Sequence, residues 1–411
     1  MLTETEKLNA LTNLGIELSK VHDLDILMER ILTEARRFVN ADAGSIYIRE
    51  ERNLNFSYTQ NDTLRKRLKP GEKLIYSTFK VAIDKESIAG YVAETGRSLN
   101  LTDVYCIDSA LPYKFGSHFD EVTRYCTRSV LTLPLKTAKQ ETLGVLQVIN
   151  AQDKENRITS FSEVDERMML HFASIASVAL ERAQMTRAIL LRMIRMAEMR
   201  DPKETGAHVN RVAGYSVELF ENWARSQGYS QKEVDRKRDI LRMAAMLHDV
   251  GKVAISDILL KKPGRFSPEE FGIIKQHTIL GARLFSERQS DLDDAAAEVA
   301  LNHHERWDGK GYPGHVHADS GHPIEAYMLQ DGTPRGKRED EIPIFGRIVS
   351  LADVFDALSS SRVYKEAWSE EDVLKTIREN AGLQFDPRLV ETLFDNLKMI
   401  RSIQERYADT A

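Results

Sequence analysis

The chain of 411 residues is long enough for two or three domains, and its apolar content of 42% is ordinary for a globular protein. The net charge of −6 argues against a general nucleic-acid binder, which needs a basic face. Two cysteines, Cys106 and Cys126, are too few for a disulfide framework and favour reduced thiols. The N-terminal segment is polar and no apolar run approaches the about 20 residues of a membrane span, so we expect a cytoplasmic protein without a membrane partner.

The first part of the chain mixes helical and strand patterns. Residues 1–40 have a helical period that breaks at His22-Asp23, and a short helix over 88–93 ends with a C-cap signal at Gly96. Four segments have the pattern of strands: 44–48, 54–58, 129–135 and 143–150. The first two alternate as half-buried strands do, and the last two predict an antiparallel pair joined by a polar turn. We therefore expect an α+β domain with an antiparallel sheet over residues 1–160.

From Phe161 the apolar period changes from two to about 3.6 residues, which is typical of a helix. Ser160 or Ser162 can cap it, with acidic residues in its first turn. The pattern continues to Asp201-Pro202, which predicts a long connector helix over 161–200. A two-stranded coiled coil between two copies of the chain would explain this length, but the apolar stripe is not a clean heptad and burial within one subunit is an open alternative.

From residue 201 to 411 the pattern is helix and loop alone, which predicts an all-α domain. Eight histidines and carboxylates lie in or beside its apolar stretches: Glu204, His208, His248, Asp249, His277, His303, His304 and Asp353. Imidazole and carboxylate are the ligands that redox-capable and borderline divalent metals prefer. Each residue alone would be read as an ordinary polar side chain. The eight together predict a cluster of two or three ions, which suits displacement of an alkoxide from phosphorus.

Glu204 and His208 are four residues apart and would share one face of a helix. His248 and Asp249 are expected to be neighbours on a helix that ends near Gly251. They would not share a face, but both could reach one ion at the helix end, and a carboxylate there can bridge two metals.

His303 and His304 would diverge by about 100° on a helix. They could bind different metals, or the same metal from a distorted helix end. Asp353 follows an apolar run, where a buried carboxylate is costly unless it is paired or bound to a metal.

The segment His248-Asp249-Val250-Gly251-Lys252 resembles the signature of the HD superfamily of metal-dependent phosphohydrolases. Residues 308–313, Asp-Gly-Lys-Gly-Tyr-Pro, resemble the second motif that defines the HD-GYP subfamily, and segments 352–358, 362–365 and 382–387 are also similar to it. The resemblance covers about residues 185–400. It implies a phosphodiesterase that opens cyclic di-GMP to pGpG and often continues to GMP.

The resemblance also implies roles for single residues. Six of them match metal-ligating positions: His248, Asp249, His277, His303, His304 and Asp353. Residues 201–208 resemble the subset in which Glu204 and His208 hold a third ion, so a trinuclear site is expected, with iron first and manganese next as the metal. Asp249, bridging two ions, and Lys252 are the expected catalytic residues. Lys252, Arg362 and Lys365 would hold phosphates, and Tyr312 would contact a guanine or ribose.

One segment departs from the family pattern. Residues 315–341 intervene where the family usually has a short stretch, and they carry His315, His317 and His322. The composition predicts a flexible surface loop. A lid over the site, a contact for a protein partner and an adventitious metal binder are the alternatives.

The N-terminal half resembles a GAF domain over about residues 5–185, on segments 41–47, 88–96 and 143–150. Asn150 and residues 161–166 partly resemble the signature of cyclic-nucleotide-binding members, but Ala151 stands where that signature has Lys. We therefore expect the GAF-like domain to bind an unknown small ligand, or to serve in dimerisation alone. We expect a homodimer in which a GAF ligand changes the packing of the connector helix and so the access to the metal site.

Other functions compete with a cyclic di-GMP phosphodiesterase. The first alternative is hydrolysis of 3′,3′-cyclic GMP-AMP. This substrate differs from cyclic di-GMP in the edge of one purine, and no motif in the sequence distinguishes the two. A non-hydrolysing receptor or scaffold is disfavoured by the intact ligand set, and an HD nucleotide phosphohydrolase by the Gly-Tyr-Pro loop and residues 362–365. The sequence leaves open the native metal, the GAF ligand and whether hydrolysis stops at pGpG.

Overall fold

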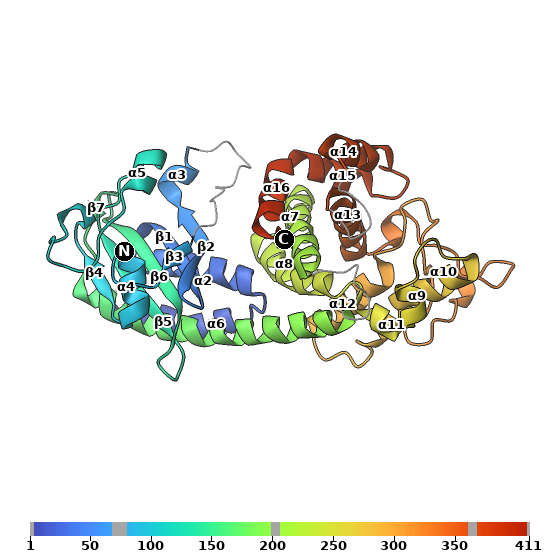
Figure 1. The fold of residues 1–411 in the computed structure, drawn as a ribbon, viewed down its shortest axis with the longest axis horizontal. Coiled ribbons are helices and arrows are strands. Elements are labelled where there is room, and N and C mark those ends of the chain that lie inside the picture. The colour runs from blue at the N-terminus through green and yellow to red at the C-terminus, as the bar shows by residue number, and fades with distance from the viewer. Residues whose placement is uncertain (1–3, 68–79, 199–205, 361–367, 409–411) are drawn as a thin grey trace. The chain divides into compact units, whose positions relative to one another are not determined.

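We describe the protein from a computed structural model, in which the described residues are 4–67, 80–198, 206–360 and 368–408 (Figure 1). The chain divides into two units, residues 1–187 and 188–411, and each is described by itself. In the described ranges, no helix is long and apolar enough to cross a membrane.

The first unit is built on a seven-stranded antiparallel sheet in the order β3-β2-β1-β6-β5-β4, with β7 paired to β6. Its strands are β1 (Ala41–Glu50), β2 (Asn53–Asn61), β3 (Lys80–Ala82), β4 (Leu99–Leu101), β5 (Val130–Lys136), β6 (Thr142–Gln152) and β7 (Ile158–Thr159). The predicted pairing of β5 with β6 is confirmed.

Helices cover both faces of this sheet. They are α1 (Glu4–Ser19), α2 (Leu24–Phe38), α3 (Asp62–Arg65), α4 (Ile88–Thr95) and α5 (His118–Thr123), with a 3₁₀ turn η1 (Val104–Cys106). The expected half-burial of β1 is wrong. Ile46 packs with the core of α2 and of the long helix α6 (Glu163–Glu198), and Tyr47 packs with α4 on the opposite face, so this central strand is buried on both sides.

Local signals set the helix ends as the sequence predicts. Asp23 caps α2 by accepting hydrogen bonds from the backbone N–H groups of Asp25 and Ile26. Gly96 ends α4 with φ of 63°, a left-handed conformation that glycine adopts without strain.

The long helix α6 (Glu163–Glu198) lies within the predicted helical range 161–200, and Ser162 accepts the N–H of Asp165 at its start. Its first half packs within the chain, because Phe172 and Leu180 lie in the core of the first unit. The later part presents exposed apolar side chains: Met185, Ile189, Met193 and Met196. Ile194 on this later part is buried in the core of the second unit, so burial within one subunit explains only part of the apolar pattern there.

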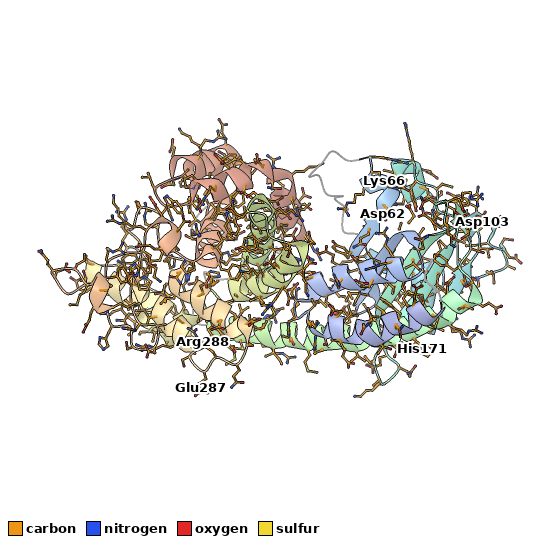
Figure 2. All side chains as sticks on the ribbon, turned by 180° about the vertical axis from the view of Figure 1, so that it is seen from behind. Asp62, Lys66, Asp103, His171, Glu287 and Arg288 are labelled. Atoms are coloured by element: carbon orange, nitrogen blue, oxygen red, sulfur yellow. The ribbon has the colours of Figure 1, made fainter. Side chains whose placement is uncertain are left out.

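Side chains outside the core hold the surface loops of the first unit. Asp103, labelled in Figure 2, accepts the N–H of Tyr105 and pairs with Arg128 at 2.6 Å. This pairing holds the loop that carries Cys106. Cys106 and Cys126 are free and exposed, as expected for reduced thiols.

The described part of the second unit consists of helices and loops without a regular strand, which confirms the predicted all-α fold. Its helices are α7 (Gly206–Ser226), α8 (Gln231–Met246), α9 (Asp257–Leu260), α10 (Pro268–Lys275), α11 (His277–Arg283), α12 (Asp291–Asn302), α13 (Ile344–Ser359), α14 (Glu370–Glu379), α15 (Pro387–Asp395) and α16 (Leu397–Arg406). Three 3₁₀ turns, η2 (Val250–Ala254), η3 (Glu325–Tyr327) and η4 (Glu339–Glu341), lie between them. Helices α7, α8, α12 and α13 pack on one another around Tyr215, Phe220, Leu241 and Ile348.

Residues 315–341 lie mostly at the surface, as their composition predicts, but the start of the segment is packed. Val316 is buried and packs with Ala282 and Leu301, which fixes the start of the segment on α11 and α12. The ring of His315 stacks on Tyr327 with centroids 3.7 Å apart. The start of the segment is therefore anchored on α11 and α12, and His315 also contacts Tyr327 within the segment.

Candidate metal centre

The first site residues lie in a turn, not on a helix as the sequence suggested. Helix α8 ends at Met246, and His248 and Asp249 occupy the turn before η2. Gly251 explains this turn, because a Cβ at this position would lie 1.9 Å from the carbonyl oxygen of His277 and 2.4 Å from the N of Gly281. The backbone of η2 thus touches α11, and this contact brings Asp249 beside His277.

Four predicted ligands form one group: Asp249, His277, His303 and His304, with ligand atoms within 4.8 Å of one another. Oδ1 of Asp249 lies 3.1 Å from Nε2 of His277 and 3.6 Å from Nε2 of His303. His303 and His304 follow the end of α12, with ring centroids 4.1 Å apart. The distorted helix end, not the divergence of a regular helix, is therefore what brings both to the same place.

The other described ligands, His208, His248 and Asp353, form a second group. Nε2 of His208 lies 3.5 Å from Oδ1 of Asp353, and Nε2 of His248 lies 4.0 Å from the same oxygen. Oδ2 of Asp249 lies 3.3 Å from Nε2 of His248. The carboxylate of Asp249 therefore faces the first group with one oxygen and the second group with the other.

Four of the imidazoles have their Nδ1 atoms engaged by the protein. His248 Nδ1 lies 2.8 Å from the carbonyl of Ala245, and His277 Nδ1 lies 2.7 Å from that of Ile274. His303 Nδ1 lies 3.1 Å from the carbonyls of Val299 and Ala300. A carbonyl only accepts, so each Nδ1 carries the proton and Nε2 keeps the lone pair that a metal requires.

The fourth engaged imidazole is His208, whose Nδ1 lies 2.8 Å from Oδ2 of Asp356. Asp356 lies within segment 352–358, and the sequence predicted no role for it. A signal for it was present, because Asp353 and Asp356 are three apart on α13, as His208 and Arg211 are on α7. Arg211 contacts Asp356 too, at 2.7 Å.

The electrostatics favour neutral imidazoles at His303 and His304 and an ionised carboxylate at Asp249. Burial lowers the pKa of His303, and burial together with the neighbouring His303 lowers the pKa of His304 well below its ordinary value. Burial disfavours the charge of Asp249, but Lys252 and His248 outweigh it and hold the pKa of this carboxyl well below its ordinary value. These are the protonation states that metal ligands need.

Two of the predicted substrate-binding residues lie beside the first group. Nζ of Lys252 is 2.7 Å from Oδ2 of Asp249. The Tyr312 ring stacks on His304, with centroids 4.8 Å apart and an interplanar angle of 26°. Gly311 lets its loop fold tightly, because a Cβ there would lie 2.3 Å from the N of Arg306.

Glu204, Arg362 and Lys365 lie outside the described residues. The third-metal role of Glu204 and the phosphate contacts of Arg362 and Lys365 stay predictions. His317 and His322 do not belong to either metal-binding group of the described part of the chain.

Comparison with known proteins identifies both halves of the chain. Residues 23–180 match the GAF domain family and residues 205–358 match the HD domain family. The chain therefore carries a GAF domain followed by an HD domain. The GAF and HD resemblances predicted from the sequence are confirmed.

Curated relatives share the HD half. The 3'3'-cGAMP-specific phosphodiesterase 2 of Vibrio cholerae is 32% identical over 266 residues, covering 63% of this chain and 44% of that protein. A cyclic di-GMP phosphodiesterase of Thermotoga maritima is 37% identical over 214 residues, 52% of this chain and 50% of that protein. A cyclic di-GMP phosphodiesterase of Vibrio cholerae is 37% identical over 221 residues, 53% of this chain and 40% of that protein. The chain thus spans about half the length of these relatives or less.

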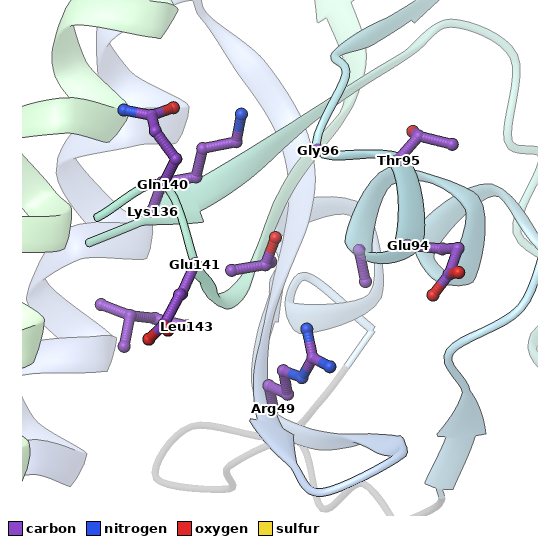
Figure 3. Close-up of a pocket in the computed structure, with 10 residues that line it drawn as sticks. Arg49, Glu94, Thr95, Gly96, Lys136, Gln140, Glu141 and Leu143 are labelled. Atoms are coloured by element: carbon purple, nitrogen blue, oxygen red, sulfur yellow. The ribbon is translucent and has the colours of Figure 1, made fainter. Parts of the chain in front are cut away.

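The first unit contains a charged cavity of about 520 Å³ between the end of α4 and the β5–β6 hairpin (Figure 3). Arg49 and Lys136 supply positive charge to its wall, and Glu94 and Glu141 supply negative charge. The backbone N–H of Lys136 donates to Oγ of Ser177 on α6 at 2.9 Å. The wall of this cavity is therefore bonded directly to the connector helix.

Proposed function

We propose that the protein is a metal-dependent phosphodiesterase of cyclic di-GMP. The position of the Asp249 carboxylate carries this proposal, because one oxygen faces His277 and the other faces His248. A carboxylate between two ligand groups is suited to hold two divalent ions a few ångströms apart. Such a pair supplies Lewis acidity and a water of lowered pKa for in-line displacement at phosphorus.

The residues of the chain have separate parts in this proposal. Asp249 would contribute one carboxylate oxygen to each ligand group, and the other described ligands would complete the two groups. Lys252 places a positive charge beside Asp249, where it can stabilise phosphoryl oxygens as their charge grows. Tyr312 borders the first ligand group through its contact with His304 and can donate its hydroxyl to the substrate. Arg362 and Lys365 are proposed to hold the second phosphate.

We propose iron as the native metal, manganese as the alternative, and a third ion at Glu204 and His208. Imidazole and carboxylate ligands accept either metal. A third ion would help to hold the terminal phosphate of pGpG and so favour a second cleavage to GMP.

The second candidate substrate is 3′,3′-cyclic GMP-AMP. The relative from Vibrio cholerae that is named as specific for it aligns with 63% of this chain. The two substrates share the phosphodiester ring and differ in one base, so the same metal site serves both.

The test is to purify the protein without oxygen, measure metal per chain, and follow pGpG and GMP from each cyclic dinucleotide. Two to three irons or manganeses per chain with faster turnover of cyclic di-GMP would support the proposal. Faster turnover of cyclic GMP-AMP would instead identify that dinucleotide, the second candidate, as the substrate. A fully metallated protein that binds both and hydrolyses neither would be a receptor.

We also propose that a small ligand of the GAF domain regulates the enzyme within a homodimer. The hydrogen bond between Lys136 and Ser177 supports this, because it joins the charged cavity to α6. The exposed apolar side chains on the later part of α6, such as Ile189 and Met196, suit pairing with a second copy. Insertion of one to four residues into α6 should change turnover with helical periodicity, and unchanged turnover in all four variants would refute the coupling.

A further inference from the structure

Helix α10 presents an exposed aromatic side chain next to the candidate metal centre. Phe271 is 41% exposed, although it is a large apolar residue. Its ring centroid lies 6.1 Å from that of Tyr312, at an interplanar angle of 80°. Tyr312 in turn stacks on His304 of the first ligand group. A short row of rings therefore leads from the ligands out to Phe271.

The ammonium group of Lys275 lies close to the two outer rings, Phe271 and Tyr312. Nζ of Lys275 lies 4.8 Å from the ring centroid of Phe271 and 5.1 Å from that of Tyr312. Nearby carboxylates are engaged elsewhere, since Glu270 pairs with Lys262 at 2.6 Å and Glu269 accepts from Ser267. Within the described ranges, no carboxylate forms an ion pair with Lys275. This ammonium therefore keeps its charge available to a ligand.

We propose that Phe271 and Lys275 form a binding platform for one guanine of the substrate. Phe271 stacks on the base, and Lys275 donates hydrogen bonds to its edge. This inference rests on the proposed function, because the metal centre must hold the phosphate that fixes the nucleotide. Aromatic rings bind bases through their π faces without regard to sequence. Guanine adds two acceptors, O6 and N7, on one edge, and Lys is a common partner for that pair.

The hydrogen-bonding groups of the two purines make this platform selective for guanine over adenine. Adenine has a donor amino group where guanine has O6, so an ammonium meets a donor at that position. The flexible four-carbon stem of Lys275 lets its amine turn from the rings to the edge of an arriving base. The platform should therefore prefer a dinucleotide with at least one guanine over one with two adenines.

The test compares Phe271→Ala, Phe271→Tyr and Ile273→Ala in the metal-loaded full chain. Ile273 is a matched control on the same helix, 44% exposed. Loss of the stacking ring should weaken binding of cyclic di-GMP by about 5- to 150-fold, measured as KM and by calorimetry, with kcat and metal content kept. Phe271→Tyr should restore binding, and Ile273→Ala should leave it unchanged.

The proposed recognition of the guanine edge by Lys275 is tested with Lys275→Ala. The control is Lys261→Ala, which removes a surface cation paired with Asp257 on α9. Only Lys275→Ala should reduce the preference for cyclic di-GMP over cyclic di-AMP, by about 5-fold or more. An equal loss for both dinucleotides would overturn this recognition, because it would show a purely electrostatic role.

The outcomes separate this platform from the proposed function. An active wild type in which Phe271→Ala leaves KM unchanged, or lowers only kcat and metal content, overturns the platform alone. In that case Phe271 only packs against Tyr312. A wild type that binds cyclic di-GMP without hydrolysing it refutes the phosphodiesterase, while weaker calorimetric binding by Phe271→Ala would still support the platform.

Discussion

Nδ1 of His208 lies 2.8 Å from Oδ2 of Asp356, and both side chains are buried. Asp356 also accepts two hydrogen bonds from Arg211, at 2.7 and 3.0 Å. Burial would raise the pKa of Asp356, but the bonds from His208 and Arg211 outweigh it and keep the pKa below its ordinary value. An ionised Asp356 fixes the ring of His208 so that Nε2 faces Asp353.

Substitution of Asp356 should therefore weaken the second ligand group without touching a ligand. Asp356→Asn removes the charge that orients His208 and that pairs with Arg211. We expect metal affinity and turnover to fall by about 10- to 100-fold, together with a loss of stability. The control is Asp340→Asn, which removes a carboxylate that is paired with Arg347 and Arg388 and is 70% exposed. Unchanged metal binding in folded Asp356→Asn protein would contradict the orienting role.

The bridging position of Asp249 predicts a pattern of metal loss. His304→Ala should reduce occupancy in the first group only, and His208→Ala in the second only. Asp249→Asn should reduce both, because an amide nitrogen cannot serve as the second ligand atom, and turnover should fall by more than about a hundredfold. Metal analysis of the three folded variants checks this. Equal losses in all three would show that Asp249 serves one ion alone.

The ligand types were predictable from the sequence because each lies beside an apolar stretch or within a motif of fixed spacing. Their grouping was not, since it depends on where helices end. His248 and Asp249 leave α8 because Gly251 must contact the backbone of α11, and that contact joins segments far apart in the chain. The double-sided burial of β1 escaped prediction for a related reason, because the pairing of distant strands decides what covers each face.

Gly251 should tolerate no side chain. A Cβ would overlap the carbonyl of His277 at 1.9 Å, and backbone cannot move aside as a flexible side chain can. We expect Gly251→Ala to lose at least about 1–3 kcal/mol of stability and to loosen the first ligand group. Gly272→Ala on α10 is the matched control, since its Cβ would meet nothing within 4 Å. It should gain about 0.5–1 kcal/mol, because alanine loses less conformational freedom in a helix. Thermal unfolding and metal content distinguish the two.

Glu298 gives a prediction on pH. This half-buried carboxyl on α12 accepts the backbone N–H of Phe345 near the start of α13, and its pKa is raised by burial, which outweighs that bond and the charges of Lys237 and Lys337. In the unfolded chain the group has an ordinary pKa of about 4.3. As pH rises above that value the unfolded chain loses its proton first, so folding takes up a proton and stability falls until the raised pKa is passed.

Glu298→Gln keeps an acceptor for Phe345 but carries no charge at any pH. The variant should match the wild type below about pH 4, gain stability relative to it as pH rises through the window, and keep a constant advantage above the raised pKa. Denaturant unfolding between pH 4 and 8 checks this, with a chelator present so that metal binding does not contribute. A difference that is the same at every pH would mean that the pKa of Glu298 is equal in the folded and unfolded chain, because the bond to Phe345 and the two lysines together offset its burial.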